Sequence, residues 1–172
     1  MIGVSHIKLR HFLPLIMTLF LFSCISTQQL EYQTNVYQKL ALRKECGDNF
    51  RLYNEAASWL NVAYADASCS RTGLDCSCLV FEIYKTVYDK TIERNTSALL
   101  KNNCRKINKH QLKAGDLVFF CTSSKPKAYV NHVGIYLKHN KFIHASVSRG
   151  VIVSDLDENY YKKSWICGGR VK

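Results

Sequence analysis

The sequence predicts an α+β domain in which helices come first and an antiparallel sheet follows. In the first half of the chain, apolar residues recur at intervals of three and four, which is typical of amphipathic helices. From Gly115 onward, short β-branched and aromatic runs separated by turn residues indicate strands instead. Because the two patterns are segregated along the chain, they favour an α+β architecture over a parallel sheet with alternating helices.

Two helices and four strands are expected. The helices are predicted over residues 51–64 and 75–89, and Asp75 is placed to cap the second one. The second helix carries a broad apolar stripe, as a helix packed on a sheet does. The strands are predicted over residues 117–121, 129–137, 141–146 and 151–153.

Length, composition and charge fit one globular domain. The chain has 172 residues, of which 47% are apolar and 12% aromatic, so disorder and a large two-domain enzyme are both excluded. Its net charge is +11. No block of five or six like charges occurs, and we therefore expect no nucleic-acid partner. For an exported protein, anionic cell-wall polymer or lipid is the expected counterpart of this charge.

Residues 1–23 have the composition of an export signal. Basic residues precede an uncharged, mostly apolar run over 12–22, which is shorter than the roughly 20 residues that a transmembrane helix needs. The following Leu21-Phe22-Ser23-Cys24 resembles a bacterial lipoprotein signal, in which the cysteine thiol is lipidated, although Phe22 is larger than usual there. The alternative is an ordinary secretory signal of which Cys24 is the last residue.

The lipoprotein interpretation divides the chain into three parts. We expect a signal peptide over residues 1–23, a lipid-anchored tether over 24–47 and the folded domain over 48–172. Residues 25–36 are polar and predict a linker. The protein would then be a monomer of the bacterial cell envelope, held on a membrane through its lipid.

Cys76 and two histidines are the candidates for chemistry. Cys76 would lie in the first turn of the second helix, where the helix dipole stabilises a thiolate. His132 and His144 would lie on neighbouring strands, where one imidazole can move a proton while the other orients it. Taken singly these signals are weak, because a helical cysteine is usually a buried apolar residue and a strand histidine usually has a structural role.

Four ordered motifs resemble those of the NlpC-type cell-wall cysteine peptidases. They are Gly73-Leu74-Asp75-Cys76-Ser77, Gly115-Asp116-Leu117-Val118-Phe119-Phe120, His132-Val133-Gly134-Ile135-Tyr136 and Phe142-Ile143-His144-Ala145-Ser146. The resemblance covers residues 57–171 and implies a papain-like fold that hydrolyses peptidoglycan stem peptides through an acyl-thioester, at the bond between D-γ-glutamyl and the following diamino acid. It implies Cys76 as the nucleophile, His132 as the general base and His144 as the residue that orients the base.

The same resemblance implies substrate contacts near the nucleophile. They fall on Tyr64, Asp75 and Ser77, and the Tyr64 hydroxyl would bind substrate or help the main-chain N–H of Cys76 to hold an oxyanion. Arg94 and Thr96 resemble a further family segment, for which a solvated loop is an equal alternative. Departures from the pattern are Cys78, which stands in place of a glycine, and Ala67-Ser68, which replace a glycine pair.

Several alternatives stay open on the sequence alone. Within catalysis, a papain-like amidase or acyltransferase is possible, and a non-catalytic wall-binding lipoprotein is the alternative from another class. We expect no cofactor and no metal, because the spacing of Cys69, Cys76 and Cys78 does not match a zinc site. The six cysteines other than Cys24 and Cys76 allow 15 disulfide pairings, and no pairing is selected.

The two histidines share a face only in one strand register. A plain two-residue turn would put His132 and His144 on opposite sides of the sheet, since alternate residues of a strand point to opposite faces. We therefore predict a three-residue loop over 138–140, which places Gly134 opposite His144 and His132 opposite Ser146.

Overall fold

The computed structural model describes residues 12–123 and 129–172, with side chains from residue 26 onward. The first part of the expected signal peptide, residues 1–11, lies outside the described residues. The helices are α1 (Phe12–Lys39), α2 (Phe50–Trp59), α3 (Cys76–Tyr88), α4 (Thr96–Ala98) and α5 (Asn159–Ser164), with a π-helical turn over Leu99–Asn103 and a 3-10 turn over Lys109–Gln111. The strands are β1 (Cys69–Ser70), β2 (Gly73–Leu74), β3 (Cys104–Ile107), β4 (Leu117–Phe120), β5 (His132–Lys138), β6 (Lys141–Ser146), β7 (Gly150–Asp155) and β8 (Trp165–Val171).

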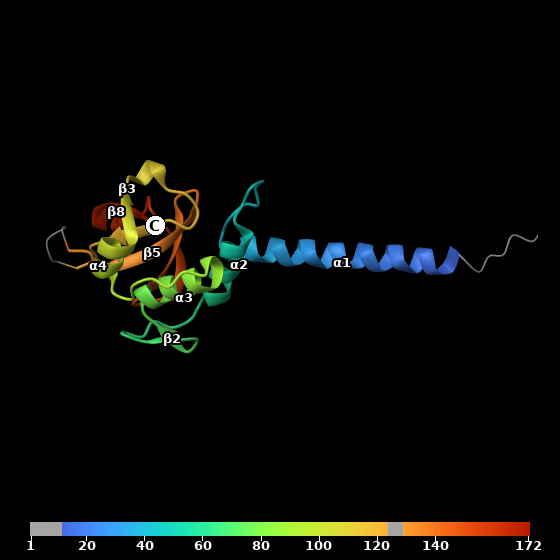
Figure 1. Cartoon of the computed structure of the whole chain (residues 1–172), viewed down its shortest axis with the longest axis horizontal. Helices are drawn as coiled ribbons and strands as arrows, with labels where there is room; N and C mark the ends of the chain where they lie inside the picture. The colour runs from blue at the N-terminus through green and yellow to red at the C-terminus, as the bar shows by residue number, and fades with distance from the viewer. Residues whose placement is uncertain (1–11, 124–128) are drawn as a thin grey trace, which may run out of the picture.

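The α+β class expected from the sequence is confirmed (Figure 1). Six strands form an antiparallel sheet in the order β3-β8-β4-β5-β6-β7, and β1 and β2 form a separate small hairpin. Val133, Ile135 and Leu137 of β5 belong to the main apolar cluster, together with α2 and α3. A second cluster on the other face contains Phe120 and Tyr161, the latter from α5. The sheet is therefore covered on both faces.

α1 differs from the linker that the polar composition of residues 25–36 predicted. The helix continues to Lys39, and it projects away from the domain in Figure 1. Its end packs into the domain, because Val36, Tyr37 and Leu40 are buried in the main cluster and the Tyr37 ring lies edge-to-face on Tyr53, 5.7 Å between centroids. Residues 36–42 therefore belong to the packed domain rather than to a flexible tether. Among the described residues, no helix is long and apolar enough to cross a membrane.

α2 is shorter than the helix predicted over residues 51–64. It ends at Trp59, and Asn61 takes a left-handed conformation with φ 67°. The main-chain N–H of Asn61 donates to the carbonyl of Val151 at 2.9 Å, and the N–H of Val151 donates to the carbonyl of Val62 at 2.8 Å. The chain leaves the helix because these bonds to β7 replace the next helical turn.

The β5–β6 hairpin has the register that the histidines require, but the predicted three-residue loop is wrong. Lys138 pairs with Lys141 across a two-residue turn, in which His139 and Asn140 have φ of 50° and 60°. The register then shifts between Tyr136 and Lys138, so that Tyr136 pairs with Phe142. A β-bulge adds one residue to one strand, and it therefore restores the pairing that the longer loop was expected to give.

Candidate active site

The start of α3 places Cys76 as the first residue of a buried helix. Asp75 is the N-cap, and its carboxylate accepts hydrogen bonds from the N–H of Cys78 and the hydroxyl of Ser77, both at 2.7 Å. Cys76 itself is only 8% exposed. A disulfide between Cys69 of β1 and Cys78 joins the small hairpin to this first turn.

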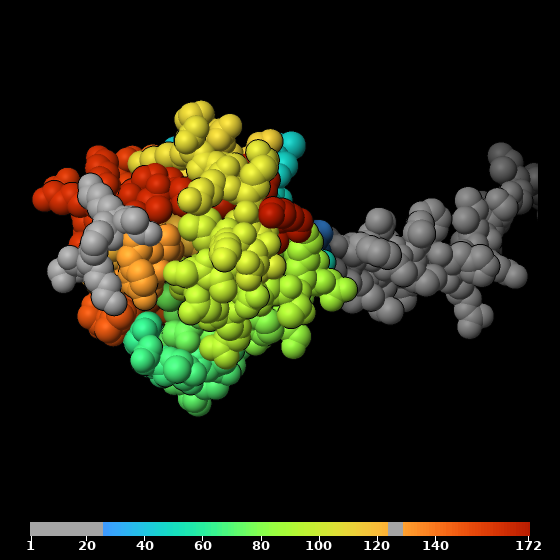
Figure 2. Space-filling model, turned by 60° about the vertical axis from the view of Figure 1, so that its left-hand side comes forward, coloured from blue at the N-terminus to red at the C-terminus, as the bar shows by residue number. Residues whose placement is uncertain are grey.

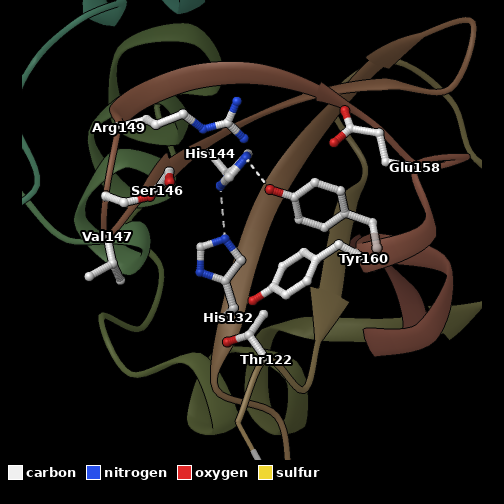
Figure 3. A pocket seen from close by; sticks show the side chains of 10 residues that line it. Thr122, His132, His144, Ser146, Val147, Arg149, Glu158 and Tyr160 are labelled. Atoms are coloured by element: carbon white, nitrogen blue, oxygen red, sulfur yellow. Dashed lines mark hydrogen bonds between the residues drawn. The ribbon is translucent and has the colours of Figure 1, made fainter.

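β5 and β6 bring the two histidines together, as the register requires. His132 Nε2 lies 2.9 Å from His144 Nδ1, and the rings meet edge-to-face (Figure 3). Gly134 makes room for this contact, since a Cβ there would lie 2.7 Å from the carbonyl oxygen of Ile143 and 3.1 Å from the Cβ of His144. The pairing leaves Nδ1 of His132 as the nitrogen available to exchange a proton.

Two hydroxyl groups hold the far side of His144. Its Nε2 lies 3.0 Å from the Tyr161 hydroxyl of α5 and 3.1 Å from the Ser154 hydroxyl of β7. For His132 to accept a proton at Nδ1, its Nε2 must carry the hydrogen and donate it to His144 Nδ1. His144 then carries its own hydrogen on Nε2, where the two hydroxyl oxygens accept it.

The Cys76 thiol lies beside the start of β5. The main-chain N–H of Val133, the residue after His132, bonds to the thiol, and Thr96 Oγ1 lies 4.0 Å from Cys76 Sγ. Burial raises the pKa of the thiol above its ordinary value, although these two contacts lower it. Burial therefore has a larger effect on the thiol pKa than the stabilisation of the thiolate that was expected from the position of Cys76 at the helix start.

The histidines are also neutral near pH 7. Burial lowers the pKa of His132 to about 4. Burial, His132 and the charge of Arg149 together lower the pKa of His144 well below its ordinary value. The resting site is therefore a neutral thiol beside a neutral imidazole pair, and a proton must leave the sulfur as it attacks.

The residues expected to contact substrate gather around the same helix start. Burial, and then the negative charge that Cys76 carries once its thiol has lost its proton, raise the pKa of Tyr64 to about 12, and the Tyr64 hydroxyl donates to Asp66 at 3.4 Å. Ser77 Oγ lies 2.5 Å from the carbonyl oxygen of Arg94, whose guanidinium is 3.4 Å from Asp75 Oδ2. The structure thus brings Arg94, which the sequence left open as a loop residue, to the site.

The β1–β2 hairpin and the segment around α4 form one side of this region. Figure 2 shows them beside one another on the surface, and the Arg94 guanidinium donates to the carbonyl of Ser68 at 3.4 Å. Cys69, Cys78 and Glu82 are the group of potential metal ligands that the described residues bring together within 4.8 Å. Two of the three are joined in the disulfide, so they offer no thiolate for a metal.

Sequence reasoning missed the residues that complete the histidine pair. Ser154 and Tyr161 come from β7 and α5, and their spacing from His144 gives no local signal.

His132 and His144 also line a pocket of about 240 Å3, together with Thr122, Ser146, Val147, Ser148, Arg149, Glu158, Tyr160 and Tyr161.

The chain is similar in sequence to known proteins of one family. Residues 61–170 match the model of the NlpC/P60 family. The chain is 32% identical over 152 residues to a probable endopeptidase NlpC homolog of Haemophilus influenzae, covering 86% of this chain and 77% of that protein. It is 33% identical over 115 residues to the murein DD-endopeptidase MepS/murein LD-carboxypeptidase of Escherichia coli K12, covering 67% of this chain and 58% of that protein.

Comparison with solved structures finds proteins of the same family. A solved NlpC/P60 family protein from Bacillus cereus superposes with a TM-score of 0.63 at 30% identity, covering 70% of this chain and 39% of the other. The papain-like α+β fold expected from the sequence is thereby confirmed. The family match covers more than half of the chain, and the chain belongs to the NlpC/P60 family.

Proposed function

We propose that this chain is a cysteine peptidase that hydrolyses peptidoglycan stem peptides, with Cys76 as nucleophile, His132 as general base and His144 as the residue that orients the base. The observation that carries the proposal is the placement of a buried thiol at the start of α3, beside a strand whose first residue, His132, is hydrogen-bonded to His144. The relative from Escherichia coli is named as acting on murein, which supports the same polymer as substrate here.

The first half of the reaction forms an acyl-thioester. Cys76 Sγ attacks the carbonyl carbon while its proton passes to Nδ1 of His132, whose Nε2–H remains bonded to His144. The main-chain N–H of Cys76 and the hydroxyl of Tyr64 are the proposed donors to the oxyanion. When the tetrahedral intermediate collapses, the C–N bond breaks and His132 returns the proton to the leaving amine.

The second half releases the acid. His132, again neutral, takes a proton from water while the water oxygen attacks the thioester carbonyl. The C–S bond breaks, the carboxylic acid departs, and the proton on His132 returns to Cys76. Asp75 and Ser77 support this cycle by fixing the helix start and its nearby cleft, since both belong to one hydrogen-bonded cluster with Arg94.

The proposed bond lies between D-γ-glutamyl and the following diamino acid. A γ-DL-glutamyl hydrolase of Bacillus subtilis, 32% identical over 109 residues, supports a γ-glutamyl carbonyl as the acyl donor. We further propose lipidation at Cys24, which would hold the enzyme as a monomer on an envelope membrane.

Incubation with purified wall fragments, followed by mass spectrometry, tests the function. We expect fragments whose masses correspond to hydrolysis before the diamino acid, produced equally with or without EDTA. Hydrolysis at a cross-link, or an acyl transfer, would give products with different masses. Either result would show that the enzyme acts on another bond than the proposed one. Binding of fragments without any mass change would instead show a non-catalytic wall-binding protein.

A further inference from the structure

The hydrogen bond between His132 and His144 continues to two hydroxyl groups on the far side of His144. His144 Nε2 lies 3.0 Å from the hydroxyl oxygen of Tyr161 and 3.1 Å from that of Ser154. The two oxygens lie 3.4 Å apart, with Ser154 donating to Tyr161. The four side chains therefore form one series of hydrogen bonds that starts at His132 and ends at the hydroxyls.

The number of hydrogens in this series links the state of His132 to that of the hydroxyls. Burial keeps both imidazoles neutral near pH 7, and the charge of Arg149 adds to this effect at His144, so each ring carries one hydrogen. One hydrogen occupies the bond between His132 Nε2 and His144 Nδ1. If it belongs to His132, Nδ1 of His132 is bare and the hydrogen of His144 is on Nε2. If it belongs to His144, His132 carries its own hydrogen on Nδ1 and cannot accept a proton there.

Two oxygens around one nitrogen favour the first arrangement. A bare imidazole nitrogen has one lone pair, in the plane of the ring, and accepts one hydrogen bond, so one hydroxyl would lie against it without a bond. An N–H group, in contrast, can be shared between two acceptor oxygens in a three-centre hydrogen bond. The nearly equal distances of 3.0 and 3.1 Å from His144 Nε2 fit a shared hydrogen.

The hydroxyl hydrogens also have acceptors in this arrangement. Ser154 donates its hydrogen to the oxygen of Tyr161. Tyr161 is among the residues that line the pocket of about 240 Å3, and Ser154 is not. The Tyr161 hydroxyl can therefore turn its hydrogen into the pocket, toward water. Both oxygens then keep a lone pair for the N–H of His144.

Packing on this face of the sheet fixes the two oxygens beside His144. Ser154 and Tyr161 are both buried. The Tyr161 ring meets the Phe142 ring edge-to-face, 4.9 Å between centroids, and the Phe142 ring stacks on His144 at 5.0 Å. Phe142 is also the direct partner of Ser154 in the pairing of β6 with β7. The acceptors are thus in place before any substrate binds.

We propose that Ser154 and Tyr161 are positioning residues that select the tautomer of His132 in which Nδ1 is bare and can take the proton of Cys76. The proposal rests on the function proposed above and adds two residues to its machinery. They act on the base through His144, along two successive hydrogen bonds. Without either hydroxyl, a buried N–H of His144 would lack an acceptor, which is costly. The hydrogen of His144 then moves to its Nδ1, and that of His132 moves to Nδ1 as well.

Nitrogen-15 NMR of the histidine rings tests the selection directly, because ring nitrogens with and without a hydrogen have well-separated chemical shifts. At pH 7 we expect the unmutated protein to carry the hydrogen of His132 on Nε2. Tyr161→Phe and Ser154→Ala each leave one acceptor and should keep this tautomer. The double variant leaves none and should carry the hydrogen of His132 on Nδ1. The signals that disappear in His132→Asn assign the ring.

Steady-state kinetics on wall fragments measures the consequence for hydrolysis. Each single variant should lower kcat by less than roughly 5-fold, because one acceptor remains for His144. The double variant should lower kcat by roughly 50-fold and change KM little, since the base and not substrate binding is affected. The loss in the double variant should thus exceed the product of the two single losses, as expected for residues that share one partner.

Tyr53→Phe provides the matched control. It removes a buried tyrosine hydroxyl that donates to the carbonyl of Leu137 at 3.4 Å, in the same strand as His132. It should change neither the tautomer of His132 nor kcat. Melting temperatures of all variants show that each one is folded.

Two NMR results would overturn the proposal: a bare Nδ1 on His132 in the double variant, or a hydrogen on that nitrogen in the unmutated protein. Either result leaves the proposed hydrolase intact if wall fragments are cut. If the tautomers change as expected and the unmutated protein cuts no fragment, the selection by the two hydroxyls is confirmed and the proposed function fails.

Discussion

At the residue scale, burial decides the chemical state of the candidate site. Cys76 and His132 are each 8% exposed, and His144 is 1% exposed. Burial disfavours charge of either sign, so it raises the pKa of the thiol and lowers the pKa values of both imidazoles. The positive charge on His132 therefore forms only when Cys76 attacks a substrate carbonyl. The oxyanion donors then stabilise the negative charge that develops on the carbonyl oxygen.

Cys76→Ala should abolish hydrolysis of wall fragments without unfolding the domain. The substitution removes the proposed nucleophile, whereas the cap from Asp75 to the N–H of Cys78 is kept. Cys78→Ala is the matched control and should retain substantial activity, because its sulfur bonds to Cys69 and not to substrate. Mass spectrometry measures both rates. Normal digestion by Cys76→Ala would exclude the cysteine-peptidase mechanism.

His144→Ala should lower kcat by roughly 100-fold and change KM little, because His144 positions His132 and does not itself touch the reacting atoms. His144→Asn should recover part of the loss, since its carbonyl oxygen can accept the hydrogen bond from His132 Nε2. Steady-state kinetics on soluble fragments gives both constants. Equal activity of the two variants would argue against an orienting role.

On acidification, the folded domain should begin to lose stability at a higher pH than protonation of its carboxylates alone would cause. The folded-state pKa of His132, about 4, lies below the unfolded value of 6.5, and that of His144 is lowered too. Below pH 6.5 the unfolded chain therefore binds more protons. Stability is full above pH 6.5 and falls toward pH 4, by up to about 1.4 kcal/mol per pH unit for each imidazole.

Urea unfolding at pH 7.5, 6 and 5 measures this effect. His132→Asn lacks one of the two groups, so its free energy of unfolding should fall less between pH 7.5 and 5 than that of the unmutated protein. Parallel curves for the two proteins would show that His132 is not buried in its neutral form.

At the scale of elements, the disulfide between Cys69 and Cys78 fixes the small hairpin to the start of α3. It closes a loop with a sequence separation of 9, for which the chain-entropy relation gives about 2–3 kcal/mol of stabilisation. Cys69→Ala combined with Cys78→Ala should lower the free energy of unfolding by this amount. Dithiothreitol should destabilise the unmutated protein similarly and leave the double variant unchanged. If the reductant affects both proteins equally, the stabilisation does not come from this bond.

Elements with a strong local pattern could be predicted from the sequence, whereas those made by tertiary contact could not. α3 and β6 were placed nearly to the residue, because a capped apolar stripe and a turn mark them. β8 was missed because Gly168-Gly169 resembles a turn. A Cβ at Gly168 would lie 2.8 Å from Ile107 Cγ1, and one at Gly169 would lie 2.6 Å from Phe119 Cε2. The glycines serve close packing in a strand, which no local propensity records.

The candidate site divides in the same way. Cys76, His132 and His144 stand in ordered motifs and could be proposed from the sequence. Arg149 and Tyr161 reach the histidines only because β7 pairs with β6 and α5 covers the sheet. The bulge after Tyr136 is a further case, since the sequence required its register without indicating how the hairpin produces it.

At the scale of the whole molecule, α1 would set the distance between the domain and a lipid attached to Cys24. Its backbone is helical through residue 24, and Val36 and Tyr37 are anchored in the domain core. Twelve residues of helix between Cys24 and Val36 span about 18 Å. A lipid at Cys24 would therefore hold the domain on a helical spacer rather than on a random coil, which limits the depth of wall that the enzyme reaches.

Replacing Cys24 with Ser should release the protein from membranes. The substitution removes the thiol that would carry the lipid, and the acyl chains, not the basic surface, are expected to supply most of the membrane affinity. Dispersed positive charge is screened at high salt, whereas buried acyl chains are not. Membrane fractions washed in 1 M salt should thus retain the unmutated protein and lose the variant. Metabolic labelling with a fatty-acid probe should mark only the unmutated protein, and the lipoprotein assignment is wrong if that protein incorporates no label.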